Sequence, residues 1–300
     1  MGIIKQMLNS KQAFQNANME GLYKLLTEEQ LRALQLTLLE MYLDIAKVCK
    51  THNIVPFLIG GSALGAIRHN GFIPWDDDLD VGMTREDYEC FKQVFEAELS
   101  DRYILNAPNY SVNPRSRFPV VLKKGTVYKS FDSFSPDLQR VYLDIFVIEN
   151  APDSKLCFWA KGIYCNFLEF VSGKVSIYEN MNEMSKEIYM RVSKAFYYSS
   201  MLIGRFFSWR KAAKWFEAID RHAQYNKPSK YVTIATGRKH YFGEVFRREQ
   251  FLPPIYVTFE DHRVPVFPDY DHYLKNLYHD YMVLPPEEKR EHHGIREMKL

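Results

Sequence analysis

Apolar residues recur at helical spacing behind a polar start signal near residue 27. Thr27-Glu28-Glu29-Gln30 has the form of a capping box, with Thr at the cap and Gln three residues later. The apolar positions that follow alternate in steps of three and four: Leu31, Leu34, Leu38, Met41, Ile45 and Val48. The pattern predicts a long amphipathic helix that ends near residues 52–53.

Short apolar runs between turn signals predict strands in the first half of the chain. Residues 54–59 form one such run and lead into a Gly-Gly-Ser turn, followed by one or two helical turns at residues 62–68. A strand is expected at residues 79–83, and Thr84 should cap a helix that extends to about residue 99. Further strands are predicted at residues 103–106, 118–123 and 140–149.

The pattern becomes helical after about residue 153 and returns to short strands near the C-terminus. Helices are predicted at residues 155–171, 184–207, 209–225 and 269–280, and strands at residues 231–236 and 257–267. This order predicts an α+β fold, a small mixed sheet flanked by helices with a helical insertion. We expect one domain over residues 1–300, made of a core at 20–150, a helical subregion at 153–230 and a C-terminal part at 231–300.

Four acids, Asp76, Asp77, Asp78 and Asp80, crowd into five positions just before the second predicted strand. Residues two apart on a strand share a face, so the carboxylates of Asp78 and Asp80 should converge, with Asp77 turned away. A divalent cation or full solvation would relieve their repulsion, and oxygen ligands favour Mg²⁺ or Mn²⁺. An EF-hand loop is excluded, because Val81 replaces the required Gly and Asp87 the bidentate Glu.

The Gly60-Gly61-Ser62 turn precedes the acids and is itself a candidate anion-binding feature. A turn between a strand and a helix presents backbone N–H groups to an anion, so Gly61 and Ser62 are candidate phosphate contacts. Joined to an Asp-x-Asp strand some sixteen residues later, it indicates a nucleotidyltransferase-type site. Asp144 is the candidate third acid, because an ionised Asp in an apolar strand is costly unless it is paired or metal-bound. A bond to buried backbone or to Arg140 is the alternative.

Three basic residues are weaker candidates for substrate binding. Arg68 and His69 follow the short predicted helix; Arg suits a bidentate phosphate contact, with a surface ion pair as the alternative. Lys123 ends a strand near Asp144 in sequence and could contact phosphate, or lie exposed at an edge.

Composition excludes several other classes. The net charge of +2 gives no reason to expect nucleic acid as a partner. The four cysteines are scattered, the N-terminus has no signal-peptide pattern and no apolar run is long enough to span a membrane. We therefore expect a cytoplasmic protein. Residues 195–217 mix large aromatics with Lys and Arg, so they either lie at the inner membrane surface or pack against the domain with a basic outer face.

The chain resembles the LicD family of phosphorylcholine transferases, which is related to the fukutin-related sugar-alcohol phosphate transferases. The resemblance is carried by residues 61–69, 71–80 and 142–146 and by a C-terminal signature between residues 259 and 286. His279 stands where the family often has Gly, and a side chain there disfavours the tight turn that Gly permits. Residues 153–230 match only weakly, so the resemblance does not fix the substrate.

The resemblance implies a nucleotidyltransferase-like fold and transfer of a phospho-alcohol from a cytidine diphosphate (CDP) donor to a hydroxyl of a glycan, either free or lipid-linked. Phosphocholine is the expected group, in teichoic-acid or lipopolysaccharide synthesis, with ribitol or glycerol phosphate as alternatives. By motif position, the metal-binding acids would be Asp76, Asp78, Asp80 and Asp144, and the last three would be catalytic. A non-catalytic nucleotide- or metal-binding module is the competing hypothesis.

Overall fold

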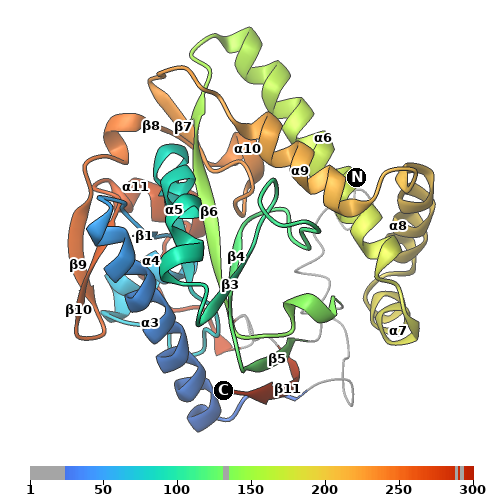
Figure 1. The fold of residues 1–300 in the computed structure, drawn as a ribbon, viewed down its shortest axis with the longest axis horizontal. Helices are drawn as coiled ribbons and strands as arrows, with labels where there is room; N and C mark the ends of the chain where they lie inside the picture. Colours follow the sequence, from blue (N-terminus) through green and yellow to red (C-terminus); the bar gives the residue numbers. More distant parts are fainter. Residues whose placement is uncertain (1–23, 131–134, 288–289, 291–293) are drawn as a thin grey trace.

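The computed structural model describes residues 24–130, 135–287, 290 and 294–300. Residues 1–23, on which the expectation about a signal peptide rests, and parts of the C-terminal polar stretch lie outside these ranges. Figure 1 shows a mixed sheet with helices on both faces and a helical subregion to one side, which confirms the predicted α+β class.

The described helices follow the sequence pattern closely in the first half of the chain. Thr27 and Gln30 form the predicted capping box at the start of the first helix, and the Thr84 hydroxyl caps the third. The α-helices are α3 (Glu28–Thr51), α4 (Gly60–His69), α5 (Arg85–Glu98), α6 (Lys155–Glu179), α7 (Glu183–Val192), α8 (Lys194–Phe207), α9 (Ala212–Ala223), α10 (His240–Gly243) and α11 (Tyr270–Tyr278). Short 3-10 helices lie at Pro136–Leu138 and Arg248–Gln250.

The strands build one seven-stranded sheet and two small two-stranded sheets. The order β1-β2-β6-β4-β3 forms the sheet, and β7 and β8 extend it from the far end of β6. Its strands are β1 (Phe57–Leu58), β2 (Asp80–Thr84), β3 (Tyr103–Asn106), β4 (Val120–Lys123), β6 (Tyr142–Ala151), β7 (Tyr231–Thr233) and β8 (Val245–Arg247). The two pairs are β9 (Ile255–Phe259) with β10 (His262–Val266), and β5 (Val127–Ser130) with β11 (Ile295–Lys299).

Two faces of β6 pack against different cores, and this decides which side chains reach the site. Leu143, Ile145 and Val147 belong to the larger core, beneath α3 and α5. Ile148 belongs to a second core with residues of α4 and α11, and Phe146 packs against it. Because side chains alternate along a strand, Asp144 lies on the same face as Phe146 and Ile148.

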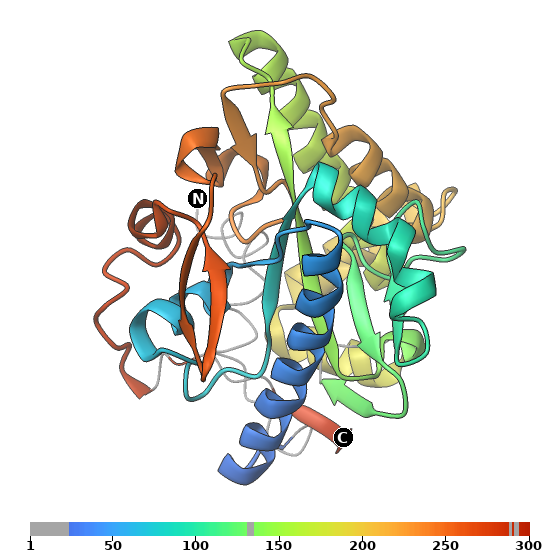
Figure 2. The same cartoon turned by 60° about the vertical axis from the view of Figure 1, so that its left-hand side comes forward.

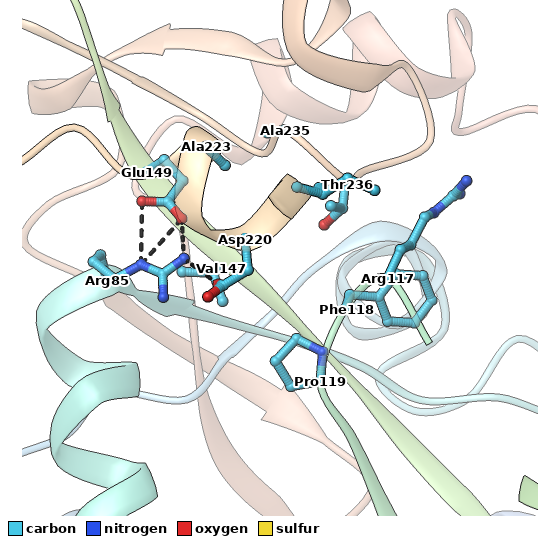
Figure 3. A pocket seen from close by; sticks show the side chains of 11 residues that line it. Arg85, Arg117, Phe118, Pro119, Val147, Glu149, Asp220, Ala223, Ala235 and Thr236 are labelled. Atoms are coloured by element: carbon cyan, nitrogen blue, oxygen red, sulfur yellow. Dashed lines mark hydrogen bonds and ion pairs between the residues drawn. The ribbon is translucent and has the colours of Figure 1, made fainter. Parts of the chain in front are cut away.

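A buried ion-pair network holds the far ends of the two central parallel strands. Arg85, the first residue of α5, binds the carboxylates of Glu149 on β6 and Asp220 on α9, the latter at 2.8 Å (Figure 3). Their side chains are 12%, 2% and 7% exposed. The network joins the sheet to the helical subregion, which has its own apolar cluster around Leu168, Trp215 and Ile219.

Four predictions about local structure need correction. The helix expected at residues 184–207 is two helices, because Ser193 leaves helical geometry and caps α8 through a hydroxyl contact with the Phe196 N–H. Residues 257–267 form a hairpin rather than one strand, and the strand near residue 80 begins at Asp80, so Asp78 precedes it. His279 adopts φ 59°, so the tight turn forms there without Gly.

All four cysteines are free thiols, as the scattered spacing predicts. Among the described residues, no helix is both long enough and apolar enough to cross a membrane.

Candidate active site

The parallel pairing of β2 and β6 places two acids side by side. Asp80 and Asp144 are direct register partners, and the Asp144 N–H donates to the carbonyl of Leu79 at 3.3 Å. Neighbouring strands lie roughly 4.8 Å apart, so these carboxylates start from adjacent backbones. The sequence therefore placed Asp144 correctly beside Asp80, although their catalytic and metal-binding roles stay predictions.

The glycine turn lies directly against the acids. A Cβ built on Gly60 would come within 2.7 Å of Asp80 Oδ2, and one on Gly61 within 2.9 Å of Asp76 Oδ2. Gly60 also has φ +54°, which a side chain would strain. Only glycine at both positions lets the two carboxylates approach the start of α4.

The N-terminus of α4 supplies positive potential to this acidic site. The helix begins at Gly60 and has no acidic residue in its own first turn. Asp76 and Asp80, which come from another segment, take that place, and negative charge is stabilised at a helix N-terminus. The same N-terminus could receive a phosphate group.

Ser62 has a structural partner. Its hydroxyl is buried and accepts a hydrogen bond from the Asp80 N–H at 2.8 Å, which fixes the start of β2 against α4. Its predicted phosphate contact stays a prediction. Asp77 precedes β2 and accepts from the buried Tyr128 hydroxyl at 2.5 Å.

Tyr278 and Arg238 are members of this site that sequence reasoning did not single out. Burial raises the pKa of Tyr278, Arg238 lowers it, and the charges of Asp80, Asp76 and Asp78 raise it further. The Tyr278 ring therefore lies within electrostatic reach of all three acids. The Arg238 guanidinium lies 5.3 Å from the centre of that ring, so a cation packs on the same tyrosine.

An aromatic pair includes the residue two positions after Asp144 on β6. Phe146 follows Asp144 by two residues on β6, and its ring lies 4.8 Å from that of Phe118. Phe118 leads into β4, whose Val120 is the register partner of Asp144. Two half-buried rings on the face of Asp144 form a surface on which a base or a quaternary ammonium could stack.

Arg68 and His69 lie near the acids but bind protein groups. Arg68 donates to the Tyr281 carbonyl at 2.7 Å and to His69 Nε2 at 2.9 Å. Burial and then the Arg68 charge lower the pKa of His69, which suits a neutral, accepting ring. Burial lowers the pKa of Arg68, while Tyr278 and Asp76 raise it. Arg68 thus ties the C-terminal segment to α4.

Lys123 does not join the site. On β4 it alternates with Val120, the partner of Asp144, and so belongs to the opposite face of the sheet. There its ammonium pairs with Glu40 of α3 at 2.6 Å. A protein carboxylate thus engages this lysine on the face of the sheet away from Asp144.

The acids offer only oxygen ligands, which is the donor chemistry of Mg²⁺ and Mn²⁺. Over the described residues, however, no group of three or more His, Cys, Asp or Glu side chains is already arranged as a metal site. Asp80 and Asp144 come from adjacent backbones, and Asp76 lies at the same helix start. The residues fit a hard cation, and the metal itself stays a prediction.

Glu244 organises the loop that carries Arg238. It is 2% exposed and accepts from the Lys239 N–H at 2.7 Å. Burial raises its pKa to about 7 from the ordinary 4.5, against the lowering effects of that hydrogen bond and of the charges of His240, Lys239 and Arg238.

Glu244→Gln should remove part of the pH dependence of stability. A carboxyl group with a raised folded pKa contributes stability that is present below about 4.5 and is lost as the pH rises through about 7. Between pH 5 and pH 8, the free energy of unfolding of the parent should fall by on the order of 2 kcal/mol more than that of Glu244→Gln. Urea unfolding at both pH values measures the difference. Glu249→Gln, at a side chain 76% exposed, is the control and should behave as the parent does. Equal pH slopes in parent and Glu244→Gln would contradict the assignment.

The mixed sheet, with acids at the adjoining starts of two parallel strands and a glycine-led helix against them, is that of a nucleotidyltransferase-like domain. Residues 53–163 match the family model described as LicD/FKTN/FKRP, nucleotidyltransferase domain.

The curated relatives that match differ in how much of the chain they cover. The lipopolysaccharide cholinephosphotransferase LicD of Haemophilus influenzae is 25% identical over 296 aligned residues, which cover 89% of this chain and 97% of the relative. An uncharacterized protein of Rickettsia typhi is 41% identical over 59 residues, or 20% of this chain and 19% of its own. One of Rickettsia prowazekii is 35% identical over 81 residues, or 25% of this chain and 30% of its own.

Proposed function

We propose that this protein transfers a phospho-alcohol, specifically phosphocholine, from a CDP-linked donor to a hydroxyl of a cell-surface glycan or its lipid-linked precursor. The observation that carries the proposal is the register of Asp80 with Asp144 beside the N-terminus of α4. The Haemophilus relative, a lipopolysaccharide cholinephosphotransferase similar over nearly its whole length, supports the choice of choline and of a glycan acceptor. Transfer of ribitol or glycerol phosphate is the alternative.

The chain's own residues have distinct tasks in such a transfer. The first turn of α4 would receive the donor phosphates, and Asp76, Asp78, Asp80 and Asp144 would hold Mg²⁺ or Mn²⁺ between them. The cation would offset charge on the diphosphate as the leaving group departs. Asp144 would accept the proton of the acceptor hydroxyl. The acceptor oxygen would form a bond to the phosphorus that carries the alcohol, while the bond from that phosphorus to the departing cytidine monophosphate (CMP) breaks. Phe118 and Phe146 would present their faces to the base or to the quaternary ammonium.

A donor panel tests the proposal directly. The protein is incubated with Mg²⁺, a glycan acceptor and CDP-choline, CDP-ribitol or CDP-glycerol in turn, and CMP release is followed. We expect the fastest release with CDP-choline, and none when the cation is chelated. Faster release with another donor would move the assignment to that alcohol. Measurable donor binding without release for all three would favour a non-catalytic binding module.

Arg238→Ala should weaken use of the donor. A guanidinium beside an acidic metal site can bind a phosphate oxygen through a charge-assisted hydrogen bond, worth about 1.5–3 kcal/mol. We therefore expect a loss of roughly 10- to 100-fold in kcat/KM for the donor, measured by CMP release. Arg247→Ala removes an exposed arginine of β8, 65% exposed, and should leave kcat/KM unchanged. Equal kcat/KM values for Arg238→Ala and Arg247→Ala would show that Arg238 does not contact the donor.

A further inference from the structure

The outer face of α6 carries a continuous stripe of exposed apolar side chains. They recur at steps of three and four and therefore share one face of the helix. Their exposed fractions are 81%, 57%, 62%, 44% and 41% for Leu156, Trp159, Ile163, Phe167 and Phe170. A stripe of this length is uncommon on a surface that meets only water.

A second stripe on α8 continues the first. Tyr198, Leu202 and Phe206 follow one another at steps of four and are 61%, 72% and 72% exposed, and Trp209 beyond the helix is 73% exposed. The Phe207 ring joins the two helices, 6.1 Å from Phe167 and 5.0 Å from Phe206. We call the α6 and α8 residues of these two paragraphs the outer face. In Figure 1 its helices lie on the side of the molecule away from α3 and β9.

The charge around the outer face has one sign. Residues 188–216 contain six Lys and Arg and no Asp or Glu, and residues 154–168 contain two Lys and no acid. Lys194, Arg205 and Lys211 are exposed. Lys214 at the edge pairs with Glu217, and Arg191 with Glu187. Cations therefore surround the apolar stripe, and the acids that could neutralise them lie only at its margins.

The outer face reaches the rim of the candidate active site. Trp159 packs on Phe242 with ring centres 4.8 Å apart, and Phe242 belongs to α10, which begins two residues after Arg238. From the inner side of α6, Glu169 binds His240 Nδ1 at 2.6 Å. One helix thus joins the exposed stripe to the loop beside the acids.

We infer that the outer face docks on an anionic lipid surface. Apolar and aromatic side chains would enter the boundary between headgroups and acyl chains, and the surrounding Lys and Arg would meet anionic headgroups. A second copy of this chain fits less well, because a two-fold contact would bring cations against cations with no acid to offset them. Figure 2 shows the sheet and α3 in front of this helical side, so docking would leave them uncovered. Docking is a property of this surface and does not depend on which donor is used.

Vesicle sedimentation of the full chain tests this inference. We expect binding to vesicles that contain about a third phosphatidylglycerol in phosphatidylcholine, weak binding to phosphatidylcholine alone, and loss of much of the binding in high salt. Leu202→Ser with Phe206→Ser should lower the partition coefficient at least tenfold. Arg205→Glu with Lys211→Glu should do so for anionic vesicles only.

Matched controls distinguish docking through the outer face from non-specific binding by other exposed apolar residues. Leu36→Ser and Tyr256→Ser change apolar residues on α3 and β9 that are 49% and 50% exposed, and they should bind vesicles as the parent does. Light scattering without lipid gives the oligomeric state, and circular dichroism shows that each variant is folded. Equal binding by the parent and the Leu202/Phe206 variant would overturn the inference. So would a dimer that this variant dissociates, in a protein that binds no vesicles.

Discussion

Asp80→Asn and Asp144→Asn should each lower the rate of transfer by about a thousandfold, the effect expected when a metal ligand or a general base is removed. The two residues face each other across parallel strands, so neither can replace the other. Single-turnover CMP release at saturating donor measures the loss. Titration with Mg²⁺ should show a higher cation requirement in both variants, because each loses one anionic ligand.

The same substitutions should not weaken the fold. Adjacent carboxylates repel, by roughly 3 kcal/mol at about 5 Å and an effective dielectric near 20, so replacing one by an amide should leave the free energy of unfolding unchanged or higher. Asp77→Asn is the matched control in the same acidic run, since Asn can still accept from the Tyr128 hydroxyl. It should keep transfer within about threefold of the parent. Activity within threefold in Asp80→Asn would exclude the β2–β6 acids from catalysis.

Much of the scaffold of this site could be predicted from local sequence. Capping by Thr27 and Thr84 depends on residues three positions apart, and the helix behind Thr27 on spacing that burial imposes. Asp144 could be found because a carboxylate within an apolar strand needs a reason to be there. Its position beside Asp80 could also be predicted, because the sequence shows both strands as apolar runs with an acid in or next to them.

The remainder depends on contacts between distant segments. Arg238 lies in a short polar loop with no pattern of its own, and its place over Tyr278 follows from the contacts of this loop with Asn276 of α11. Lys123 was assigned to the site from nearness in sequence, whereas the register of Val120 with Asp144 puts it on the other face. β5 and β11 are each too short to signal a strand alone, and they pair across more than 160 residues.

Arg85→Met should lower the free energy of unfolding by about 3–5 kcal/mol, because it leaves Glu149 and Asp220 buried without their cation. Arg102→Met is the control: Arg102 pairs with Asp44 but is 55% exposed, so its loss should cost less than about 1 kcal/mol. Urea unfolding at pH 7 compares the two variants. Losses of similar size would mean that the Arg85 network does not stabilise the fold.

The pH dependence of the Arg85→Met defect provides a second readout. Burial raises the pKa of Glu149 and Arg85 lowers it, so removing Arg85 should raise that pKa further. Stability from a raised carboxyl pKa is present below the unfolded value and is lost as the pH rises, so the defect should shrink toward pH 4.5 and grow toward pH 8. Glu149→Gln combined with Arg85→Met should flatten this difference.

Turnover by the folded Arg85→Met protein should nevertheless stay near the parent value. β2 and β6 run parallel from Asp80 and Asp144 to Thr84 and Ile148, and the Arg85 network lies one residue beyond. Five residues of strand put about 16 Å between the network and the acids. The same two strands thus carry two like charges at one end and a buried, neutralising ion pair at the other. If folded Arg85→Met loses activity tenfold or more, the two ends are coupled, and the network positions the acids as well as stabilising the sheet.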